Sequence, residues 1–269
     1  VTPGVSNIFV RDLNEQSICA LSGSPPRRTN PMYQVVDTLP HQAGVHALRA
    51  GVDVVINNDT ITYPRSFRGS YSFSTLENFL SGNYSGFTQT FGDPVVSQTN
   101  PNIGMYAQDE WRVGSSLTLN LGLRYDLQFL TPITTDTNNV SPRAGFAWSP
   151  SASANLVVRG SAGLFFDRVP LRAAANAILS AGNTTDLNNL HQPSVSGLIP
   201  TQAGGPVFRN ILPAQILTTT LVDFTTMDKD LQSGYSKQAS LEVERVIARG
   251  LTASAGYQYL RGANLLMSV

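Results

Sequence analysis

Residues 116–128 alternate between apolar and small or polar side chains, and this pattern constrains the fold more than any other feature. The apolar positions are Leu117, Leu119, Leu121, Leu123, Tyr125 and Leu127. Because successive side chains of a strand point to opposite sides, the pattern predicts a strand with one apolar and one polar face. Soluble strands are usually about 5–6 residues long, whereas a tilted strand needs about 9–11 to cross a bilayer. The length of the alternation therefore favours a strand whose six apolar side chains face lipid.

The composition agrees with alternating strands. Charged residues make up 13% of the chain, against about 25% in an ordinary soluble domain, yet the hydrophobic fraction is 41% and the mean hydropathy −0.07. A membrane protein built from helices would show apolar runs of about 18 residues, and the sequence has none. The formal net charge is zero and no Lys/Arg cluster stands out, so nucleic-acid binding is not expected.

Turn and loop signals divide the chain into four segments. We expect an N-terminal loop or extension over 1–31, barrel strands with loops over 32–168, a long outer loop with a short helix over 169–233, and a barrel hairpin with a truncated end over 234–269. Within them, strands are expected at 32–39, 45–56, 67–73, 103–113, 116–128, 141–150, 155–166, 235–246 and 251–260. The apolar spacing predicts short helices near residues 76–80 and 171–179.

Short turns alternate with long polar connections, which is the asymmetry of membrane barrels with short periplasmic turns and longer outer loops. The predicted fold class is all-β: an antiparallel transmembrane-type β-barrel, or part of one, with roughly nine or ten strands, almost all antiparallel, and one long outer loop. A loop as long as 169–233 usually binds, covers or gates something.

The same alternation predicts which side chains line each part of the wall. Those expected to face the lumen are Arg49, Asp53, Arg124, Asp126 and Arg159. Those expected in an aromatic girdle are Tyr106, Trp111, Phe129, Trp148, Tyr257 and Tyr259.

Enzyme chemistry is not expected. His41, His46 and His191 lack the spacing of a metal site, so loop or core positions are favoured for them. Asp109 and Glu110 are neighbours on an expected strand, so they point to opposite faces and cannot act as a carboxylate pair. We expect no catalytic, cofactor-binding or metal-binding residues and no cofactor.

Several segments resemble one family. Residues 106–112 (YAQDEWR) and 117–126 (LTLNLGLRYD) resemble the barrel of TonB-dependent outer-membrane receptors, as do residues 141–148 and 158–167. The likeness is strongest to the Oar-like members, which begin with a carboxypeptidase-regulatory-like domain. The resemblance implies a fragment of a barrel of about 22 strands, plugged by an N-terminal domain, that takes up a siderophore, oligosaccharide or peptide across the outer membrane of a Gram-negative bacterium.

Two alternatives use the same alternation. In the first, a structural protein, copies of a shortened barrel or sheet pair through their strand edges into an extracellular tube or filament. In the second, a soluble β-sandwich binding module, the apolar faces of two sheets meet across about 10 Å. The expected partners are outer-membrane lipid, possible copies of the chain itself through unpaired strand edges, and a small nutrient ligand of unknown identity.

Overall fold

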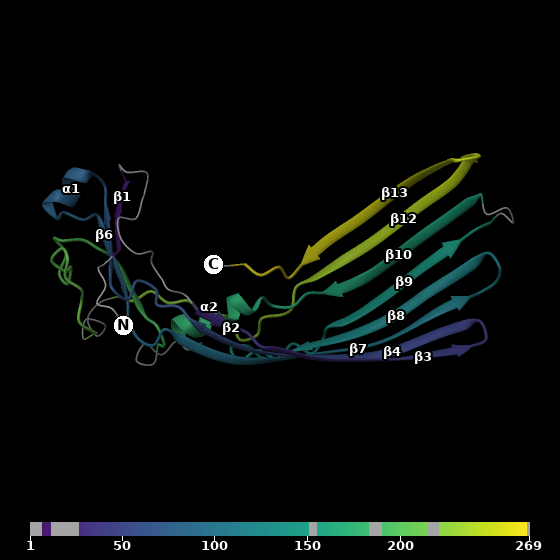
Figure 1. The fold of residues 1–269 in the computed structure, drawn as a ribbon, viewed down its shortest axis with the longest axis horizontal. Helices are drawn as coiled ribbons and strands as arrows, with labels where there is room; N and C mark the ends of the chain where they lie inside the picture. Colours follow the sequence, from purple (N-terminus) through teal and green to yellow (C-terminus); the bar gives the residue numbers. More distant parts are fainter. Residues whose placement is uncertain (1–6, 12–26, 151–154, 183–189, 215–220, 268–269) are drawn as a thin grey trace. The chain divides into compact units, whose positions relative to one another are not determined.

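A computed structural model describes residues 7–11, 27–150, 155–182, 190–214 and 221–267 of the 269-residue chain. The chain divides into two compact units (Figure 1). Unit 1 comprises Val1–Pro31, Asn58–Gln98 and Leu171–Asp228, and unit 2 comprises Met32–Asn57, Thr99–Pro170 and Lys229–Val269.

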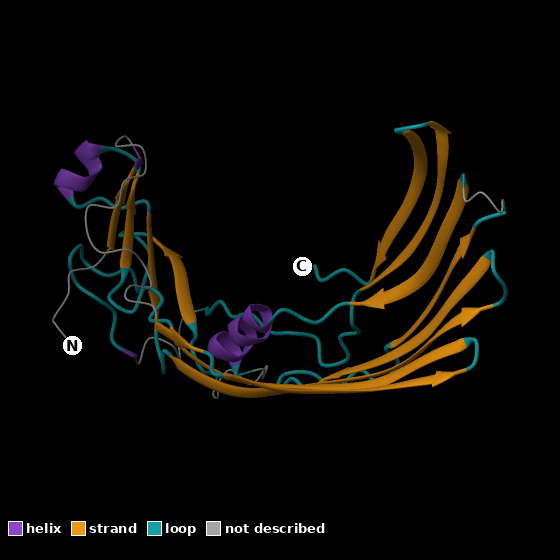
Figure 2. Ribbon diagram, turned by 45° about the vertical axis from the view of Figure 1, so that its right-hand side comes forward, coloured by secondary structure: helices purple, strands orange, loops and turns teal. Residues whose placement is uncertain are grey.

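Most of the strands belong to one nine-stranded sheet, and every pairing within it that is described in register is antiparallel. The order is β13-β12-β10-β9-β8-β7-β4-β2, and β3 also pairs with β4. The strands are β2 (Arg27–Thr29), β3 (Met32–Ala43), β4 (His46–Thr62), β7 (Val95–Arg112), β8 (Leu117–Gln128), β9 (Val140–Trp148), β10 (Leu156–Phe166), β12 (Tyr235–Ala248) and β13 (Leu251–Ala263). The strands of unit 2 form a single curved layer (Figure 2).

The hairpin turns of this sheet lie at the same end of the strands. Two residues join β3 to β4, four join β7 to β8, and two join β12 to β13. Gly44 and Gly250 have φ angles of 60° and 82°, a backbone conformation that glycine adopts without a steric penalty. The connections from β4 to β7, from β8 to β9 and from β10 to β12 leave the opposite end and are long. The sheet therefore has a short-turn end and a long-loop end.

Unit 1 contains a second, four-stranded sheet in the order β1-β5-β6-β11. Its strands are β1 (Asn7–Val10), β5 (Ser70–Phe73), β6 (Gly86–Thr90) and β11 (Ser194–Leu198). Alternate side chains of these strands are sealed in a small aromatic core that includes Tyr71, Phe73, Tyr84, Phe87, Val195 and Leu198. The segment that follows β11 also contributes to this core. It is attached through the Tyr71 hydroxyl, which donates a hydrogen bond to the carbonyl oxygen of Asn210 at 2.5 Å.

Two short helices belong to unit 1. α1 (Leu76–Ser81) begins after Thr75, whose side chain accepts a hydrogen bond from the Asn78 amide, and ends at Gly82 in the left-handed conformation. α2 (Leu171–Ala181) buries an alanine-rich face. Neither helix of the described chain has the length and apolar character needed to span a membrane.

Parts of the expected organisation are wrong. The segment 1–31, expected as loop, contains β1 and β2, and between the strands expected at 67–73 and 103–113 the structure also has β6 and the start of β7. The 169–233 loop contains β11 as well as its helix, and β1 pairs with β5 in parallel. These strands, apart from β7, are three to five residues long, so their alternation is too brief to distinguish them from loop.

Candidate functional site

The strands of unit 2 form a wall with two chemically different faces. The side chains from Leu117 to Leu127 that were expected to face lipid lie on one face of β8, called here the apolar face. Leu121 and Leu123 are 48% and 52% exposed, because no other layer of the described chain covers them. The apolar face therefore lacks a packing partner within the described part of unit 2.

The strand register carries this face across the sheet. One continuous row of paired residues runs from β7 to β13: Trp111, Leu119, Phe146, Gly160, Leu241 and Tyr257. Gly160 leaves space for the Phe146 ring, since a Cβ there would lie 2.4 Å from a ring carbon. Paired residues of adjacent strands thus point to the same side of the sheet, so the apolar residues of β7 to β13 share one surface.

The opposite, polar face carries an ion-pair network. Arg124 donates hydrogen bonds to both carboxylate oxygens of Asp126 at 2.8–3.0 Å. Gly104, opposite Asp126, leaves room for the guanidinium, because a Cβ there would overlap an Arg124 nitrogen. Asp53 accepts a hydrogen bond from Gln34 at 2.8 Å. Arg124 and Asp126 therefore lie on the same face of β8.

Farther along the polar face, a second ion pair joins β10 to β12. Arg159 donates to Glu244 at 2.8 Å, and the Ser161 and Ser240 hydroxyls lie 2.8 Å apart. Arg49 and Arg159 both line a hollow of about 620 Å³ in unit 2, together with Gln108, Asn120, Arg143 and Gln258. The wall therefore offers hydrogen-bond donors and acceptors to a polar molecule.

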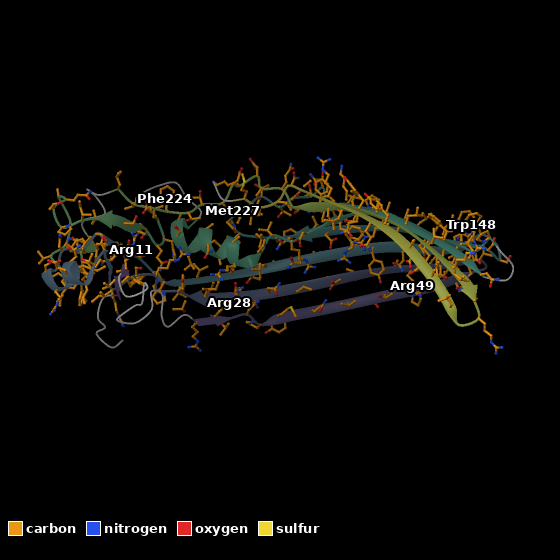
Figure 3. All side chains as sticks on the ribbon, turned by 90° about the horizontal axis from the view of Figure 1, so that it is seen from above. Arg11, Arg28, Arg49, Trp148, Phe224 and Met227 are labelled. Atoms are coloured by element: carbon orange, nitrogen blue, oxygen red, sulfur yellow. The ribbon has the colours of Figure 1, made fainter. Side chains whose placement is uncertain are left out.

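Five of the six expected girdle side chains share the apolar face, and one does not. Trp111, Phe129, Trp148, Tyr257 and Tyr259 lie at positions of apolar parity. Trp148 lies at the short-turn end, where Figure 3 also shows Arg49, whereas Phe129 follows the end of β8 near the long loops. Tyr106 lies opposite Arg124 on the polar face and its hydroxyl is 3.0 Å from that of Thr38. Its expected place was wrong because Tyr106 and Trp111 are five residues apart, and side chains an odd number apart on a strand point to opposite faces.

One cluster escaped the sequence analysis. His46 Nδ1 lies 2.7 Å from an Asp109 carboxylate oxygen, and the His46 ring stacks on Trp111 at 5.3 Å. Asp109 and Trp111 have the i, i+2 spacing that shares a face, but the contact with His46 depends on how β4 pairs with β7. Glu110 is on the other face, beside Arg112, as expected. Among the described residues, no three His, Cys, Asp or Glu side chains are grouped to hold a metal ion.

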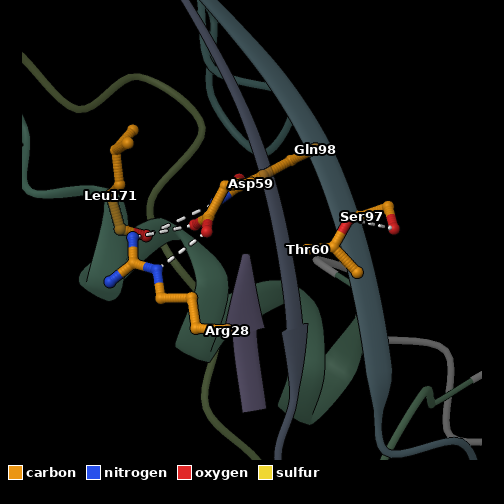
Figure 4. Close-up of polar contacts among 6 residues, drawn as sticks. All are labelled: Arg28, Asp59, Thr60, Ser97, Gln98 and Leu171. Carbon is orange, nitrogen blue, oxygen red and sulfur yellow. Dashed lines mark hydrogen bonds and ion pairs between the residues drawn. The ribbon is translucent and has the colours of Figure 1, made fainter. Parts of the chain in front are cut away.

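A buried polar network in unit 1 also lay outside the expectations. Arg28 binds Asp59 through two hydrogen bonds of 2.7 and 2.9 Å, and the Asp59 side chain is completely buried (Figure 4). The amide of Gln98 donates to Asp59 at 3.3 Å and to the Leu171 carbonyl oxygen at 3.5 Å. Arg28 was expected in a loop, and no local pattern pairs it with Asp59, 31 residues away.

The comparisons with known proteins identify the class. A family model described as an outer membrane beta barrel domain matches residues 1–134 and 130–268, so the chain belongs to this family. A curated relative, the TonB-dependent transporter Oar of Myxococcus xanthus, is 28% identical over 171 residues, which are 56% of this chain and 16% of the relative.

A solved structure shows the same fold, and a second was matched with a lower score. The outer membrane transporter YddB from Escherichia coli matches 87% of this chain and 26% of its own, at 15% identity and a TM-score of 0.53. The siderophore receptor PirA from Acinetobacter baumannii matches 94% of this chain and 30% of its own, at 12% identity and a TM-score of 0.49. The chain thus spans about a sixth of the curated relative and about a quarter of these structures.

These findings confirm the expected fold class and the resemblance to TonB-dependent receptors. The chain is a largely antiparallel sheet of outer-membrane β-barrel type that is not closed on itself, and its location is the outer membrane of a Gram-negative bacterium. That location brings the protein into contact with lipid. The curated relative Oar and the structure YddB are both described as transporters. The filament and the soluble sandwich are not favoured, and in unit 2 no second sheet of the described chain faces the exposed leucines.

Proposed function

We propose that the chain forms part of the barrel wall of a TonB-dependent receptor that takes up a nutrient across the outer membrane. The apolar face of unit 2 contacts lipid, the polar face lines the lumen, and the long-loop end faces the cell exterior. The siderophore, oligosaccharide and peptide classes all remain compatible with the wall. Unit 1, which contains most of the two longest connections, contributes to ligand recognition outside the cell.

One observation carries this proposal: the strand register keeps the parity of the two faces from β7 to β13, and most positions of the apolar face carry apolar side chains. In water, exposed leucines such as Leu121 and Leu123 would create a large apolar patch. In hydrocarbon the same side chains need no protein partner, while the antiparallel pairing satisfies the backbone hydrogen bonds.

The edges of the sheet fit a larger barrel. β3 and β13 each pair on one side only among the described strands. Unpaired backbone groups cost several kcal/mol each in hydrocarbon, so both edges require a neighbour. We propose that strands of the same barrel supply these neighbours, in preference to further copies of the chain.

Adjacent cysteine labels on β8 test the assignment of the faces. A fluorophore attached at Leu121→Cys should be quenched by bilayer lipids that carry bromine on the acyl chain, whereas the same fluorophore at Asn120→Cys should respond to a water-soluble quencher. Both positions lie on one strand, so the pair controls for depth in the membrane. Equal quenching at the two positions by the brominated lipid would contradict the proposal.

Uptake itself is tested in cells that express the parent receptor. Replacing residues 171–228 by a short Gly/Ser linker should abolish growth on the transported nutrient while the barrel still reaches the outer membrane. Growth at the normal rate would show that this part of unit 1 has no role in recognition.

A further inference from the structure

Two cations lie next to each other on the apolar face of unit 2. Lys237 on β12 and Arg261 on β13 are directly paired in the strand register. Lys237 shares the parity of Leu241, and Arg261 shares that of Tyr259, so both belong to the apolar face. Charged side chains on the lipid face of a barrel are destabilising, so their presence calls for a compensating interaction.

The described chain provides no counter-charge for this pair. The apolar-face positions of β10, β12 and β13 include no Asp or Glu. Among the described residues, neither cation forms an ion pair, in contrast to Arg124 and Arg159 on the polar face. Like charges that oppose each other across two strands repel, and an anion bound between them would remove that repulsion.

The surroundings of the pair are those of a membrane interface. Lys237 Nζ lies 5.9 Å from the centre of the Tyr235 ring, so the side chain extends toward the long-loop end of β12. The Tyr235 ring packs against Phe166 with the ring centres 5.3 Å apart. Lysine and arginine near an interface extend their charged groups toward water while their stems cover apolar surface.

We propose that Lys237 and Arg261 bind the phosphate of a lipid in the outer leaflet, with Phe166, Tyr235 and Tyr259 packing against its acyl chains. A phosphate fits because the guanidinium can donate two parallel hydrogen bonds to its oxygens, and the ammonium adds a second positive charge. A lipid fits because both cations stand on an apolar surface rather than on the polar face. The assignment to the outer leaflet rests on the orientation given under Proposed function.

Arg245 provides a matched control on the same strand. It shares the face of Lys237 but lies near the short turn, and Ala253 rather than a second cation is opposite to it. If the proposal holds, neutralising Arg245 removes one positive charge from β12 without affecting the paired site.

Native mass spectrometry of the full chain in detergent tests the site with lipid A that bears two phosphates. The wild type should retain this lipid, and Lys237→Gln/Arg261→Gln should retain about tenfold less or lower, as expected for loss of charge-assisted hydrogen bonds. Arg245→Gln should retain the wild-type amount. Dephosphorylated lipid A should bind the wild type as weakly as phosphorylated lipid A binds the double variant.

Each other result overturns the proposal. Equal retention by the double variant, or equal binding of the dephosphorylated lipid, shows that the cations do not select a phosphate. Displacement of the lipid by an excess of inorganic phosphate, with phosphate itself retained, shows a site for the free ion. An equal loss in Arg245→Gln shows a general effect of charge. Bromine quenching at Leu121→Cys in each variant separates these results from a failure of membrane insertion.

Discussion

The two units use alternating strands in opposite ways. In unit 1 the alternate side chains Tyr71 and Phe87 are completely buried, and their rings are 4.6 Å apart. In unit 2 the alternate side chains Leu121 and Leu123 are about half exposed. The same period of two therefore produces a sealed core in one unit and an open apolar face in the other, and what covers the apolar side decides between them.

The covering chain is visible in unit 1. The side-chain amide of Gln89 on β6 accepts a hydrogen bond from the Leu212 amide at 2.8 Å and donates one to the Leu212 carbonyl oxygen at 3.2 Å. Together with the Tyr71 bond to Asn210, these contacts hold residues 206–212 against the small sheet. In unit 2, Gln128 binds the backbone of Val169 in the same manner, but on the polar face. The apolar face of unit 2 has no such covering segment among the described residues of that unit.

The largest effect is expected in the sealed core. Phe87→Ala removes a completely buried ring that packs against Tyr71 and Tyr84, and it should destabilise unit 1 by about 3–5 kcal/mol. Limited proteolysis at increasing denaturant concentration measures this loss. Leu80→Ala is the control, because Leu80 is 78% exposed on α1 and should leave the profile unchanged. An equal loss in both variants would indicate that the core is not sealed.

Introducing a charged side chain on β8 should distinguish the two faces of unit 2. Leu121→Arg should destabilise the bilayer-inserted barrel by about 2–4 kcal/mol, because the guanidinium would lie in hydrocarbon. Asn120→Arg, one residue away on the polar face, should be tolerated. Urea unfolding of the reconstituted protein, followed by tryptophan fluorescence, compares the two. If both variants are equally stable, the apolar face does not contact lipid.

Alkaline pH should affect the core of unit 1. Burial raises the pKa of the Tyr71 hydroxyl far above its ordinary value of about 10, and burial also raises the pKa of Tyr84. A pKa that is raised in the folded state contributes stability below pH about 10 and loses it as the pH rises toward the folded value. Unit 1 should therefore unfold at alkaline pH as tyrosinate absorbance increases.

Tyr71→Phe serves as the control for this titration. It should weaken the pH dependence and lower stability at neutral pH by about 1 kcal/mol, through loss of the bond to Asn210. An unchanged alkaline transition in Tyr71→Phe would assign the effect to another group.

The smallest effect is expected for the ion pairs of the polar face. Arg124→Gln removes three hydrogen bonds to Asp126 at a site where both side chains are 24% exposed, and should cost about 1 kcal/mol. Arg159→Gln removes an exposed pair and should fall within the error of the same urea titration. The reverse order would show that β10 and β12 are less accessible to water than the structure indicates.

Long strands could be predicted from the sequence, whereas of the strands with five residues or fewer only β5 (Ser70–Phe73) was expected, within 67–73. The strand expected at 116–128 is β8 (Leu117–Gln128), and the one expected at 155–166 is β10 (Leu156–Phe166). Their alternation extends over many residues, so it determines both the strand and its faces. β1 and β11 are four and five residues long, and their place depends on partners far away in the chain.

The candidate site shows the same limit. Strand parity alone places Arg124 with Asp126, and it would also have separated Tyr106 from Trp111. In contrast, the contacts of His46 with Asp109 and of Arg28 with Asp59 join different strands. The opposition of Lys237 and Arg261 also depends on the register of β12 and β13, which their turn and the register shift between Val246 and Ala248 determine together.

The hydrogen bonds of Gln89 to Leu212 and of Gln128 to Val169 have a consequence for how the sequences of such loops can change. Gln89 and Gln128 each recognise a main-chain amide and carbonyl, which every residue except proline offers. The side chains of the attached segments can therefore change while their anchorage persists. Evolution, or a designer who grafts new loops, can exchange the recognition surface without rebuilding the strands beneath it.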